Sequence, residues 1–507
     1  MRCAALLVVA STAAWADARC IACHAGIVDN YAKTGMGRSM SRPRAESQVQ
    51  RSWFHDMSGR RMGIDWRDGK MLHFVEDRSN RAVHEMAWAI GSGNEGKSYI
   101  TLIGDSLFQS PISWYSARLF WDMSPGYHID ARPDFNRPVT NECLTCHAGQ
   151  SAPIAGTQNR YAEPAIVEAA IGCARCHGDP SAHLSKAQRG NIVNPAKLAR
   201  ERRDSVCESC HLSGEARILN PGKQFSDFKP GMQLEEIFSV YVPRKKSADT
   251  VLKVISHSEQ MASSMCAEKS DGKLWCASCH DPHKQPAERE KAAFYRDRCI
   301  ACHARETIAG HLSKAGDDCV KCHMPRTRAY DGGHTAFTDH WIRTRKSEER
   351  FLDRGEFLRA WREPPASFQK RNLALAYVGN AAKSRSLARY REGIRLLNES
   401  VQEGHRDPSF AAVVGLQFLR DKHPERAAAW FQLAVRQEPA NSLARLNFAA
   451  ALAGLGKTDQ AKREAEEAIR LEPLLEDAYA LLAEIEPKRA GYWKDQYRKL
   501  APKRILP

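Results

Sequence analysis

Apolar and polar residues alternate over several short stretches in the first quarter of the chain, which predicts β-strands. Residues 62–66 alternate up to Asp68-Gly69, and residues 72–74 alternate after it. An Asp-Gly pair between two alternating runs favours a two-residue hairpin turn. A second hairpin is predicted where residues 98–103 reach Gly104-Asp105 and the chain returns through Leu107.

Tryptophan is concentrated in this same region. Met86, Trp88 and Ile90 form another segment of period two. The tryptophans of the region are Trp53, Trp66, Trp88, Trp114 and Trp121. We interpret them as the core of a small β-rich module rather than as a stacking platform for sugars or bases.

The last third of the chain is rich in alanine and has a helical pattern with a repeat of 34 residues. Ala427 and Ala434 recur as Ala461 and Ala468, and Pro439 recurs as Pro473. This period is typical of tetratricopeptide repeats, in which small residues stand where paired helices cross. A looser copy is expected over residues 372–405, with a partial copy after Leu474. Such α-solenoids commonly bind peptides or proteins, so we expect the repeats to dock a partner protein.

Between these regions, Gly and Pro interrupt the chain often, and Cys-x-x-Cys-His recurs. This motif occurs seven times, six of them between residues 141 and 325. It is the attachment signature of c-type haem, whose vinyl groups the two thiols bind while the adjoining imidazole ligates the iron. The cofactor-binding cysteines are Cys20, Cys23, Cys143, Cys146, Cys173, Cys176, Cys207, Cys210, Cys276, Cys279, Cys299, Cys302, Cys319 and Cys322. The proximal iron ligands are His24, His147, His177, His211, His280, His303 and His323.

Other uses of these cysteines do not require the histidine. Zinc sites and disulfide frameworks also use paired cysteines, but neither needs histidine directly after every second one. We therefore predict seven covalent haems c, which would themselves form most of the apolar core of residues 141–340. Cys266 belongs to no motif, and we favour an inert thiol over the alternative of a redox role beside a haem.

A second histidine on each iron would give low-spin haems suited to electron transfer. The candidate distal ligands are His183, His257, His283, His311, His334 and His340. His183 and His283 each follow a motif and a turn, and His311 just precedes the last motif. For His55, His73, His84 and His128 in the β module, ligation and a plain structural role remain open; His73 could lie on the wet face of its strand. His405 and His423 are expected on the surface of the repeats.

Charge and termini refine this interpretation. The formal net charge is +15, but each haem has two propionates, so seven haems would add about fourteen acidic groups. The basic balance is thus explained without nucleic acid, which we do not expect as a partner. Arg2, the apolar residues 3–14 and Ala14-Trp15-Ala16 resemble a secretory signal with its cleavage site. We expect export to the periplasm or beyond, with no transmembrane segment after signal removal.

These patterns divide the chain into six parts. We expect a signal peptide over 1–16, the first haem motif and the β-rich module over 17–140, and a six-haem cytochrome domain over 141–340. A linker over 341–365, helical repeats over 366–490 and a tail over 491–507 complete the chain. The predicted fold class is a multidomain, mainly α and irregular haem-cored protein with a small β-rich module and a C-terminal α-solenoid.

Three stretches resemble multihaem cytochromes related to pentahaem nitrite reductase, octahaem hydroxylamine oxidoreductase and the tetrahaem cytochromes of nitrifying bacteria. They are residues 172–178 with His183, residues 276–283, and residues 318–325 followed by Asp339-His340. In that lineage the downstream Asp-His histidine commonly ligates a haem, which supports His340. Residues 90–94, 113–115, 123–127 and 141–143 resemble a bacterial group that combines such haems with C-terminal tetratricopeptide repeats.

The chain departs from the enzymes of this lineage in one respect. Their nitrite reductases usually have lysine in place of the motif histidine at the catalytic haem, whereas all seven motifs here end in histidine. We therefore favour an electron carrier whose repeats dock a redox partner. The alternative is an oxidoreductase for a small nitrogen or sulfur compound at one haem with an open distal position. A third hypothesis, an assembly or sensing protein, keeps the repeats as the functional part.

Overall fold

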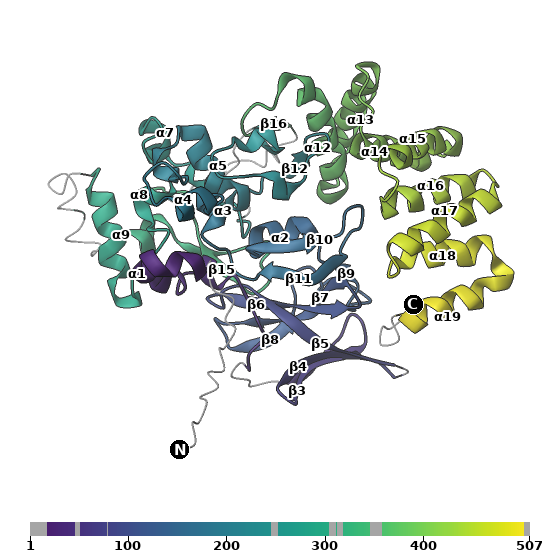
Figure 1. The fold of residues 1–507 in the computed structure, drawn as a ribbon, viewed down its shortest axis with the longest axis horizontal. Coiled ribbons are helices and arrows are strands. Elements are labelled where there is room, and N and C mark those ends of the chain that lie inside the picture. Colours follow the sequence, from purple (N-terminus) through teal and green to yellow (C-terminus); the bar gives the residue numbers. More distant parts are fainter. Residues whose placement is uncertain are drawn as a thin grey trace.

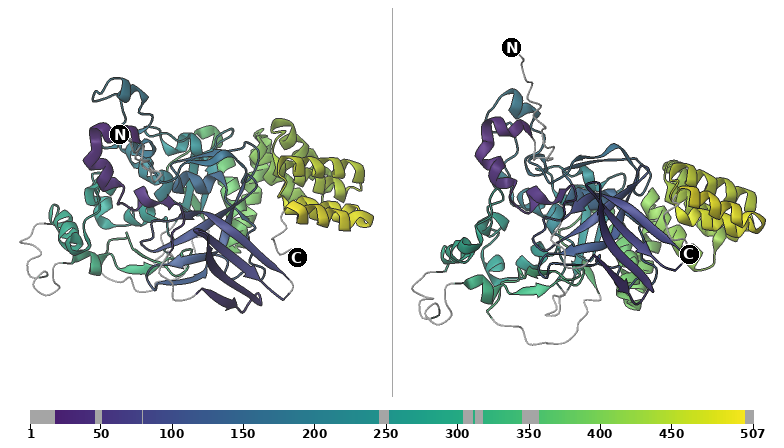
Figure 2. Two further views of the ribbon diagram at one scale, coloured as in Figure 1. Left: turned by 60° about the horizontal axis from the view of Figure 1, so that its bottom comes forward. Right: turned by 90° about the horizontal axis from the view of Figure 1, so that it is seen from below.

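The computed structural model describes residues 18–45, 51–78, 80–244, 252–303, 311, 318–344 and 357–500. The predicted signal peptide, residues 1–16, lies outside them. Three parts follow one another along the chain (Figure 1): a β module (strands β1 to β9), a motif segment (residues 141–344) and a helical solenoid (residues 369–500). In both views of Figure 2 the solenoid lies on the opposite side of the β module from helix α1 (Ile21–Tyr31).

The β module is one antiparallel sheet of nine strands. Its main path is β2-β3-β4-β5-β6-β7-β8, with β1 paired to β5 and β9 to β7. The strands are β1 (Met40–Ser41), β2 (Ser52–His55), β3 (Arg60–Arg67), β4 (Lys70–Glu76), β5 (Arg81–Ile90), β6 (Gly96–Ile103), β7 (Ser106–Tyr115), β8 (Phe120–Met123) and β9 (Arg137–Pro138). The sheet is larger than the small module expected, because β1 and β9 add to it from outside the alternating region.

Both predicted hairpins are confirmed. Arg67 pairs with Lys70 across Asp68-Gly69, and both turn residues have positive φ, 51° and 74°. That backbone is the one that favours Asp-Gly in two-residue turns. Ile103 pairs with Ser106 across the second turn.

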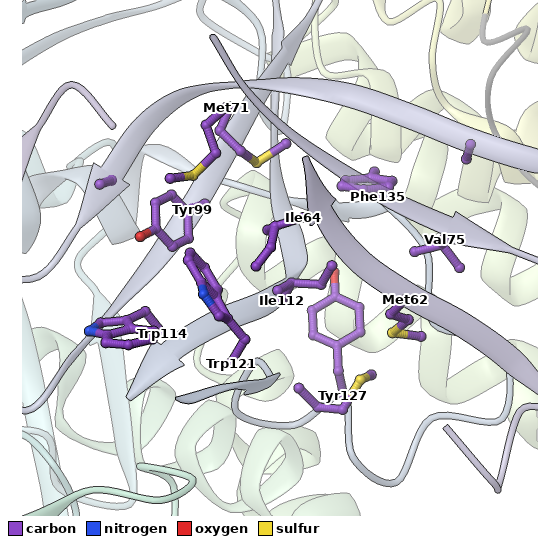
Figure 3. Close-up of a cluster of buried hydrophobic side chains, with 14 residues drawn as sticks. Met62, Ile64, Met71, Val75, Tyr99, Ile112, Trp114, Trp121, Tyr127 and Phe135 are labelled. Atoms are coloured by element: carbon purple, nitrogen blue, oxygen red, sulfur yellow. The ribbon is translucent and has the colours of Figure 1, made fainter. Parts of the chain in front are cut away.

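The core of the β module contains most of the predicted tryptophans. Trp114 and Trp121 are buried, Trp53 packs against the same cluster, and Trp88 packs against a neighbouring one. Figure 3 shows Trp114, Trp121, Tyr99 and several methionine and aliphatic side chains pointing toward one another. Trp66 is the exception, since 39% of it is exposed near the β3–β4 turn.

His73 does not lie on a wet face. It is completely buried, on the same face of β4 as the core residues Met71 and Val75. Leu72 and Phe74 lie on the opposite face of β4, which is also covered. Their alternation therefore made the face that contains His73 look exposed in the sequence. His73 Nδ1 lies 2.7 Å from Ser110 Oγ, and the ring packs edge-on against Tyr99 and Trp121.

The motif segment consists of short helices, hairpins and loops. Its helices are α2 (Asn141–His147), α3 (Ala174–His177), α4 (Ser181–Ser185), α5 (Arg200–His211), α6 (His257–Met261), α7 (Met265–Lys269), α8 (Cys276–Cys279), α9 (Lys291–Ile300) and α11 (Cys319–His323). Its strands are β10 (Gln150–Pro153), β11 (Tyr161–Glu168), β12 (Ala216–Leu219), β13 (Phe238–Pro243), β14 (Arg326–Arg328) and β15 (Ala336–Thr338). One part of the segment nevertheless has a side-chain core of its own, formed by Leu212, Phe228, Leu234, Ile237, Phe238 and Val240.

Part of the predicted linker 341–365 belongs to a sheet. Strand β16 (Leu358–Ala360) pairs with β13, which pairs in turn with β12. The chain that leads into the solenoid therefore completes a sheet of the motif segment.

The solenoid is formed by paired antiparallel helices, which confirms the tetratricopeptide-like repeat. They are α12 (Gln369–Ser384), α13 (Leu387–Gln402), α14 (Pro408–Arg420), α15 (Pro424–Gln437), α16 (Ser442–Gly454), α17 (Thr458–Leu471), α18 (Glu476–Ile485) and α19 (Ala490–Leu500). The repeated alanines 427, 434, 461 and 468 are completely buried, as expected where helices cross closely. Residues 491–500 of the predicted tail belong to helix α19, whose Trp493 and Tyr497 pack on α18.

The solenoid is attached to the rest of the molecule at two places. Helix α12 packs on β12, β13 and β16, where Asn372 Nδ2 donates to Asn220 Oδ1 at 2.9 Å and to Ser239 Oγ at 3.0 Å. Farther along, the loop between β10 and β11 contacts the solenoid through Gly156, Gln158 and Arg160. Among the described residues, no helix is both long and apolar enough to cross a membrane.

Candidate haem cavity

The motifs line one large cavity. Its volume is about 2780 Å³, and each of the seven motifs contributes at least one residue to its wall. A pocket for one small ligand typically has roughly 300–1,000 Å³. The cavity therefore has room for several cofactors of haem size, lined by the thiols and imidazoles that haem c requires.

Local helical structure orients each motif. The two cysteines are three residues apart and the histidine follows the second, so one turn of helix brings all three to the same side. Motif 207–211 ends α5, motif 143–147 ends α2, and motif 319–323 forms α11. The first motif starts α1, which is held against the third motif because Tyr31 Oη donates to the Ile171 carbonyl at 2.7 Å.

Five motif histidines lie opposite a second histidine. Ring centroids are 6.3 Å apart for His24 and His183, 5.9 Å for His177 and His283, 6.1 Å for His280 and His340, 6.0 Å for His323 and His311, and 5.1 Å for His211 and His257. An iron bonded to two imidazole nitrogens at about 2 Å each would separate the ring centres by roughly 6 Å. Four of the five pairs therefore leave the space that an iron atom needs between the rings.

Backbone carbonyls fix several of these rings. The Nδ1 atoms of His177 and His323 lie 2.8 Å from the carbonyl oxygens of Val193 and Arg343, and His340 Nδ1 lies 2.9 Å from that of Thr338. A carbonyl only accepts, so Nδ1 is protonated in each ring and the Nε2 lone pair is left for a metal. This is the usual outer arrangement of a metal-ligating histidine.

Burial keeps the imidazoles neutral. Burial lowers the pKa of His257 to about 2 and that of His280 to about 4. It also lowers the pKa of His147, His283 and His340. A neutral ring is the form that binds metal, and His257 Nδ1 is buried with no hydrogen-bond partner among the described residues.

Contacts between thiols order the motifs in space. A hydrogen bond with Cys210 raises the pKa of Cys146, and one with Cys276 raises that of Cys207. Motif 207–211 thus lies between motifs 143–147 and 276–280. Motif 173–177 also lies beside motif 207–211, because Cys176 lies near Cys210, the same thiol that Cys146 contacts.

The far end of the series is formed by the last two motifs. Burial and the neighbouring Cys319 raise the pKa of the Cys299 thiol, to about 11. Cys279 of motif 276–280 lies next to this end of the series. Burial raises the pKa of Cys279, and the nearby thiols of Cys266 and Cys302 add to that rise. Cys266 therefore lies at the cavity wall beside motif cysteines.

Two motif histidines are not paired. All nineteen histidines of the chain are within the described residues, and none of them is in ring contact with His147 or His303. Near the first of these, Arg217 Nη1 lies 3.9 Å from Cys146 Sγ, and its Nε has no partner within the described part of the chain.

One predicted distal ligand lies elsewhere. His334 Nε2 lies 2.7 Å from Asp122 Oδ2, and the ring packs against Tyr115 and Phe120 of the β module. The structure brings it to no motif histidine. Of the β-module histidines, His84 packs against Phe135 and His55 Nδ1 lies 2.8 Å from Ser58 Oγ, so neither lies at the cavity.

Sequence reasoning missed the groups that hold α5 in place. Glu208, inside the motif 207–211, is buried and contacts Trp361 and Arg362. Only the glutamate's position between two motif cysteines could have drawn attention to it. In the described residues, no group of three or more His, Cys, Asp or Glu side chains is arranged to hold a metal ion. A haem iron needs only one or two protein ligands, because the porphyrin supplies the others.

No family model and no curated protein matches the chain. Several solved structures match part of it. A mutant of MamA is 22% identical over 27% of this chain and 77% of its own length, with a TM-score of 0.23. YrrB, a TPR protein with an unusual peptide-binding site, is 19% identical over 27% of this chain and 70% of its own, with a TM-score of 0.24. The first TPR of Spaghetti (RPAP3), bound to an HSP90 peptide, is 24% identical over 23% of this chain and 94% of its own length, with a TM-score of 0.21.

Proposed function

We propose that this chain is an exported c-type cytochrome with seven covalent haems, which transfers electrons through haems that are mostly ligated by two histidines. The observation that supports this most is the set of five histidine pairs around one cavity. Five of the six distal ligands predicted from the sequence each face a motif histidine. His257 and His340 also lie near each other, with 4.7 Å between their ring centroids, so these two second histidines share one part of the cavity.

The chain's own residues have three tasks in this proposal. The fourteen motif cysteines would hold the porphyrins, and the motif histidines and the second histidines would ligate the irons. When bound, the haems supply one-electron redox chemistry. The carbonyls of Val193, Arg343 and Thr338 orient the rings. The thiol contacts place motif 207–211 next to motifs 143–147, 173–177 and 276–280, with motifs 299–303 and 319–323 beyond the last of these.

The first test counts haems and identifies their ligands. We expect seven haems per chain by mass spectrometry and haem assay, and mainly low-spin signals by electron paramagnetic resonance of the oxidised protein. Fewer attached haems, or zinc in place of iron, would contradict the proposal.

Replacing one distal histidine tests the pairing directly. His183→Ala should convert one low-spin haem to high spin, because His24 then has no partner ring across from it. His405→Ala, on the solenoid and away from the cavity, is the matched control and should leave the spectrum unchanged. If His183→Ala keeps every low-spin signal, the pairing of His24 with His183 is wrong.

A second candidate function is favoured by His147 and His303, which have no opposite histidine in the described residues. A haem with an open distal position can bind and transform a small molecule, so the chain could be an oxidoreductase for a small nitrogen or sulfur compound. A stoichiometric high-spin signal in the unmodified protein, altered by nitrite or hydroxylamine, would support this function. An unaltered spectrum would leave the electron carrier as the function.

The location and the partner belong to the same proposal. Residues 1–16 direct export to the periplasm or beyond, and the solenoid docks a redox partner protein; the resemblance to multihaem cytochromes of the nitrite reductase and hydroxylamine oxidoreductase lineage agrees with both. N-terminal sequencing of the purified protein should begin at Asp17. A mature chain that still begins at Met1 would contradict export by cleavage.

A further inference from the structure

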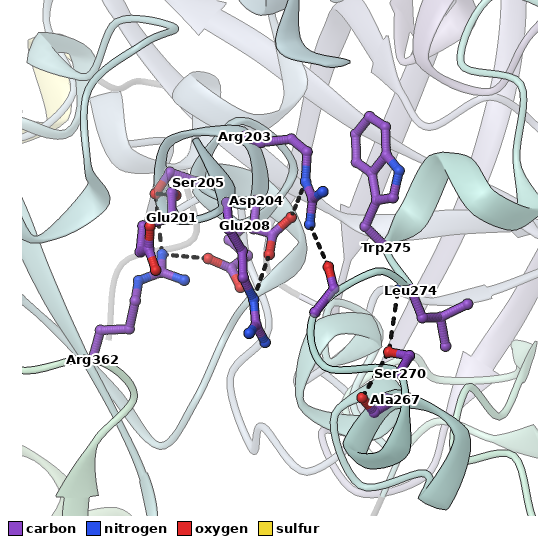
Figure 4. Close-up of polar contacts among 12 residues, drawn as sticks. Glu201, Arg203, Asp204, Ser205, Glu208, Ala267, Ser270, Leu274, Trp275 and Arg362 are labelled. Carbon is purple, nitrogen blue, oxygen red and sulfur yellow. Dashed lines mark hydrogen bonds and ion pairs between the residues drawn. The ribbon is translucent and has the colours of Figure 1, made fainter. Parts of the chain in front are cut away.

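Helix α5 is bonded to two other parts of the molecule through its charged face (Figure 4). On one side, Arg203 Nη2 donates to the Gly272 carbonyl at 3.2 Å, and its guanidinium lies 4.7 Å from the centre of the Trp275 ring. Trp275 directly precedes motif 276–280. Arg203 therefore connects the helix that ends in one haem motif to the start of the next.

On the other side, α5 is bonded to the segment that enters the solenoid. We call Arg362 with Glu208, Glu235 and Ser205 the Arg362 bridge. Arg362 Nε lies 3.1 Å from Glu235 Oε1, and Nη2 lies 3.0 Å from Ser205 Oγ and bonds Glu208 Oε2. Trp361 Nε1 donates to the other oxygen of Glu208 at 3.0 Å.

The Arg362 bridge places charge beside the haem motifs. The Glu208 and Glu235 side chains are each only 8% exposed, so water screens them little. Glu208 stands between Cys207 and Cys210, and its charge acts on the thiols of both Cys207 and Cys276. One guanidinium therefore faces two buried carboxylates beside motif 207–211, and one of these carboxylates, Glu208, also acts on the Cys276 thiol.

We propose that Glu208 and Arg362 are positioning residues that set the reduction potential of the haem at Cys207, Cys210 and His211. This inference rests on the proposed function, and it adds a way for the solenoid to act on the haems, since Trp361 and Arg362 lead directly into α12. Reduction adds one electron at the iron and breaks no bond in the protein. A nearby negative charge opposes that added electron, and a nearby positive charge favours it.

Two substitutions of opposite charge effect test the proposal. In the holoprotein, Glu208→Gln removes a negative charge while its amide oxygen still accepts from Trp361, so the midpoint potential of one haem should rise. Arg362→Gln removes the compensating positive charge, so the same midpoint should fall. Glu392→Gln, in the exposed pair with Arg395 on α13, is the matched control and should leave all midpoints unchanged.

Spectroelectrochemical titration, with haem counted on each sample, separates the outcomes. Opposite shifts of one midpoint, with seven haems retained, support the proposal. Shifts in the same direction would show that the bridge acts only by holding structure, and titrations that superimpose on the parent would overturn it entirely. Fewer than seven haems in the unsubstituted protein would instead contradict the proposed function.

Discussion

At the scale of single residues, the histidines differ in what their ring nitrogens meet. His177, His323 and His340 donate Nδ1–H to carbonyls and line the cavity. His73 is equally hidden, but it lies inside the β module beside Ser110 and two aromatic rings. The same side chain is thus used in one part as a candidate ligand and in the other as a neutral core residue.

The buried His73 should make the β module sensitive to acid. Burial lowers the pKa of His73 from 6.5 to about 3. The unfolded chain takes up a proton below about pH 6.5 and the folded chain does not, so stability should fall as the pH drops from about 6.5 toward 3, by a few kcal/mol. His73→Phe should cost about 1 kcal/mol at pH 7 through the lost hydrogen bond, yet remove much of this acid loss. Urea unfolding of the parent and His73→Phe proteins at pH 7 and pH 4.5 measures the loss of stability on acidification. An equal loss in both proteins would contradict the role of buried, neutral His73.

Candidate residues could be identified from the sequence when they lie close to a Cys-x-x-Cys-His motif along the chain. Motif cysteines and histidines are adjacent in the chain, and His183 and His283 follow a motif closely, so all of these could be chosen. The pairing could not, because His183 faces His24 and His283 faces His177, across long sequence separations. His334 had the same loop setting as His257 and His340, but it contacts Asp122 and no motif histidine.

At the scale of elements, the repeat period predicted the solenoid helices well because each helix pair packs mainly on its neighbours. The hairpins were also predicted, since their turns are coded by two adjacent residues. Strand β16 and the attachment of α12 were not, because they depend on partners more than one hundred residues earlier in the chain. The bonds of Trp361 and Arg362 to α5 follow from that attachment.

Two glycines of the solenoid test how closely its helices pack. A Cβ at Gly415 on α14 would approach the Phe431 ring to 2.7 Å, so Gly415→Ala should destabilise the protein by about 1–3 kcal/mol. Gly379 on α12 is exposed with nothing within 4 Å of its Cβ position, so Gly379→Ala should instead stabilise its helix by up to about 1 kcal/mol. Thermal unfolding of both variants decides the matter. Equal effects of the two substitutions would contradict the close crossing of α14 and α15.

At the scale of the whole molecule, the solenoid is held at its first helix and again near its middle. The loop between β10 and β11 reaches the α15–α16 and α17–α18 connections, where the Ser442 amide donates to the Gly156 carbonyl at 3.0 Å and the Gln158 amide to Glu472 at 3.3 Å. The solenoid is therefore held at two points against the part of the molecule that contains the cavity.

This second attachment can be loosened without touching the cavity. Gly156 has φ +79°, and a Cβ there would lie 2.2 Å from the Ala440 carbonyl oxygen. Gly156→Ala should break the contact and speed hydrogen exchange of the Ser442 amide about fivefold, as expected when one hydrogen bond of about 1 kcal/mol is lost. Gly104→Ala shares the positive φ but meets nothing within 4 Å, so it controls for backbone strain. Unchanged exchange in Gly156→Ala would show that the loop does not hold the solenoid.

The pairing of β16 with β13 also has a consequence for how the protein is made. Residues 358–362 leave the ribosome more than one hundred residues after β13 and after all seven haem motifs. The sheet next to motif 207–211 and the bonds from Trp361 and Arg362 to Glu208 therefore form only once nearly three quarters of the chain has been synthesised. Under the proposed function, every cysteine pair would therefore be available for haem attachment before Arg362 can bond to Glu208.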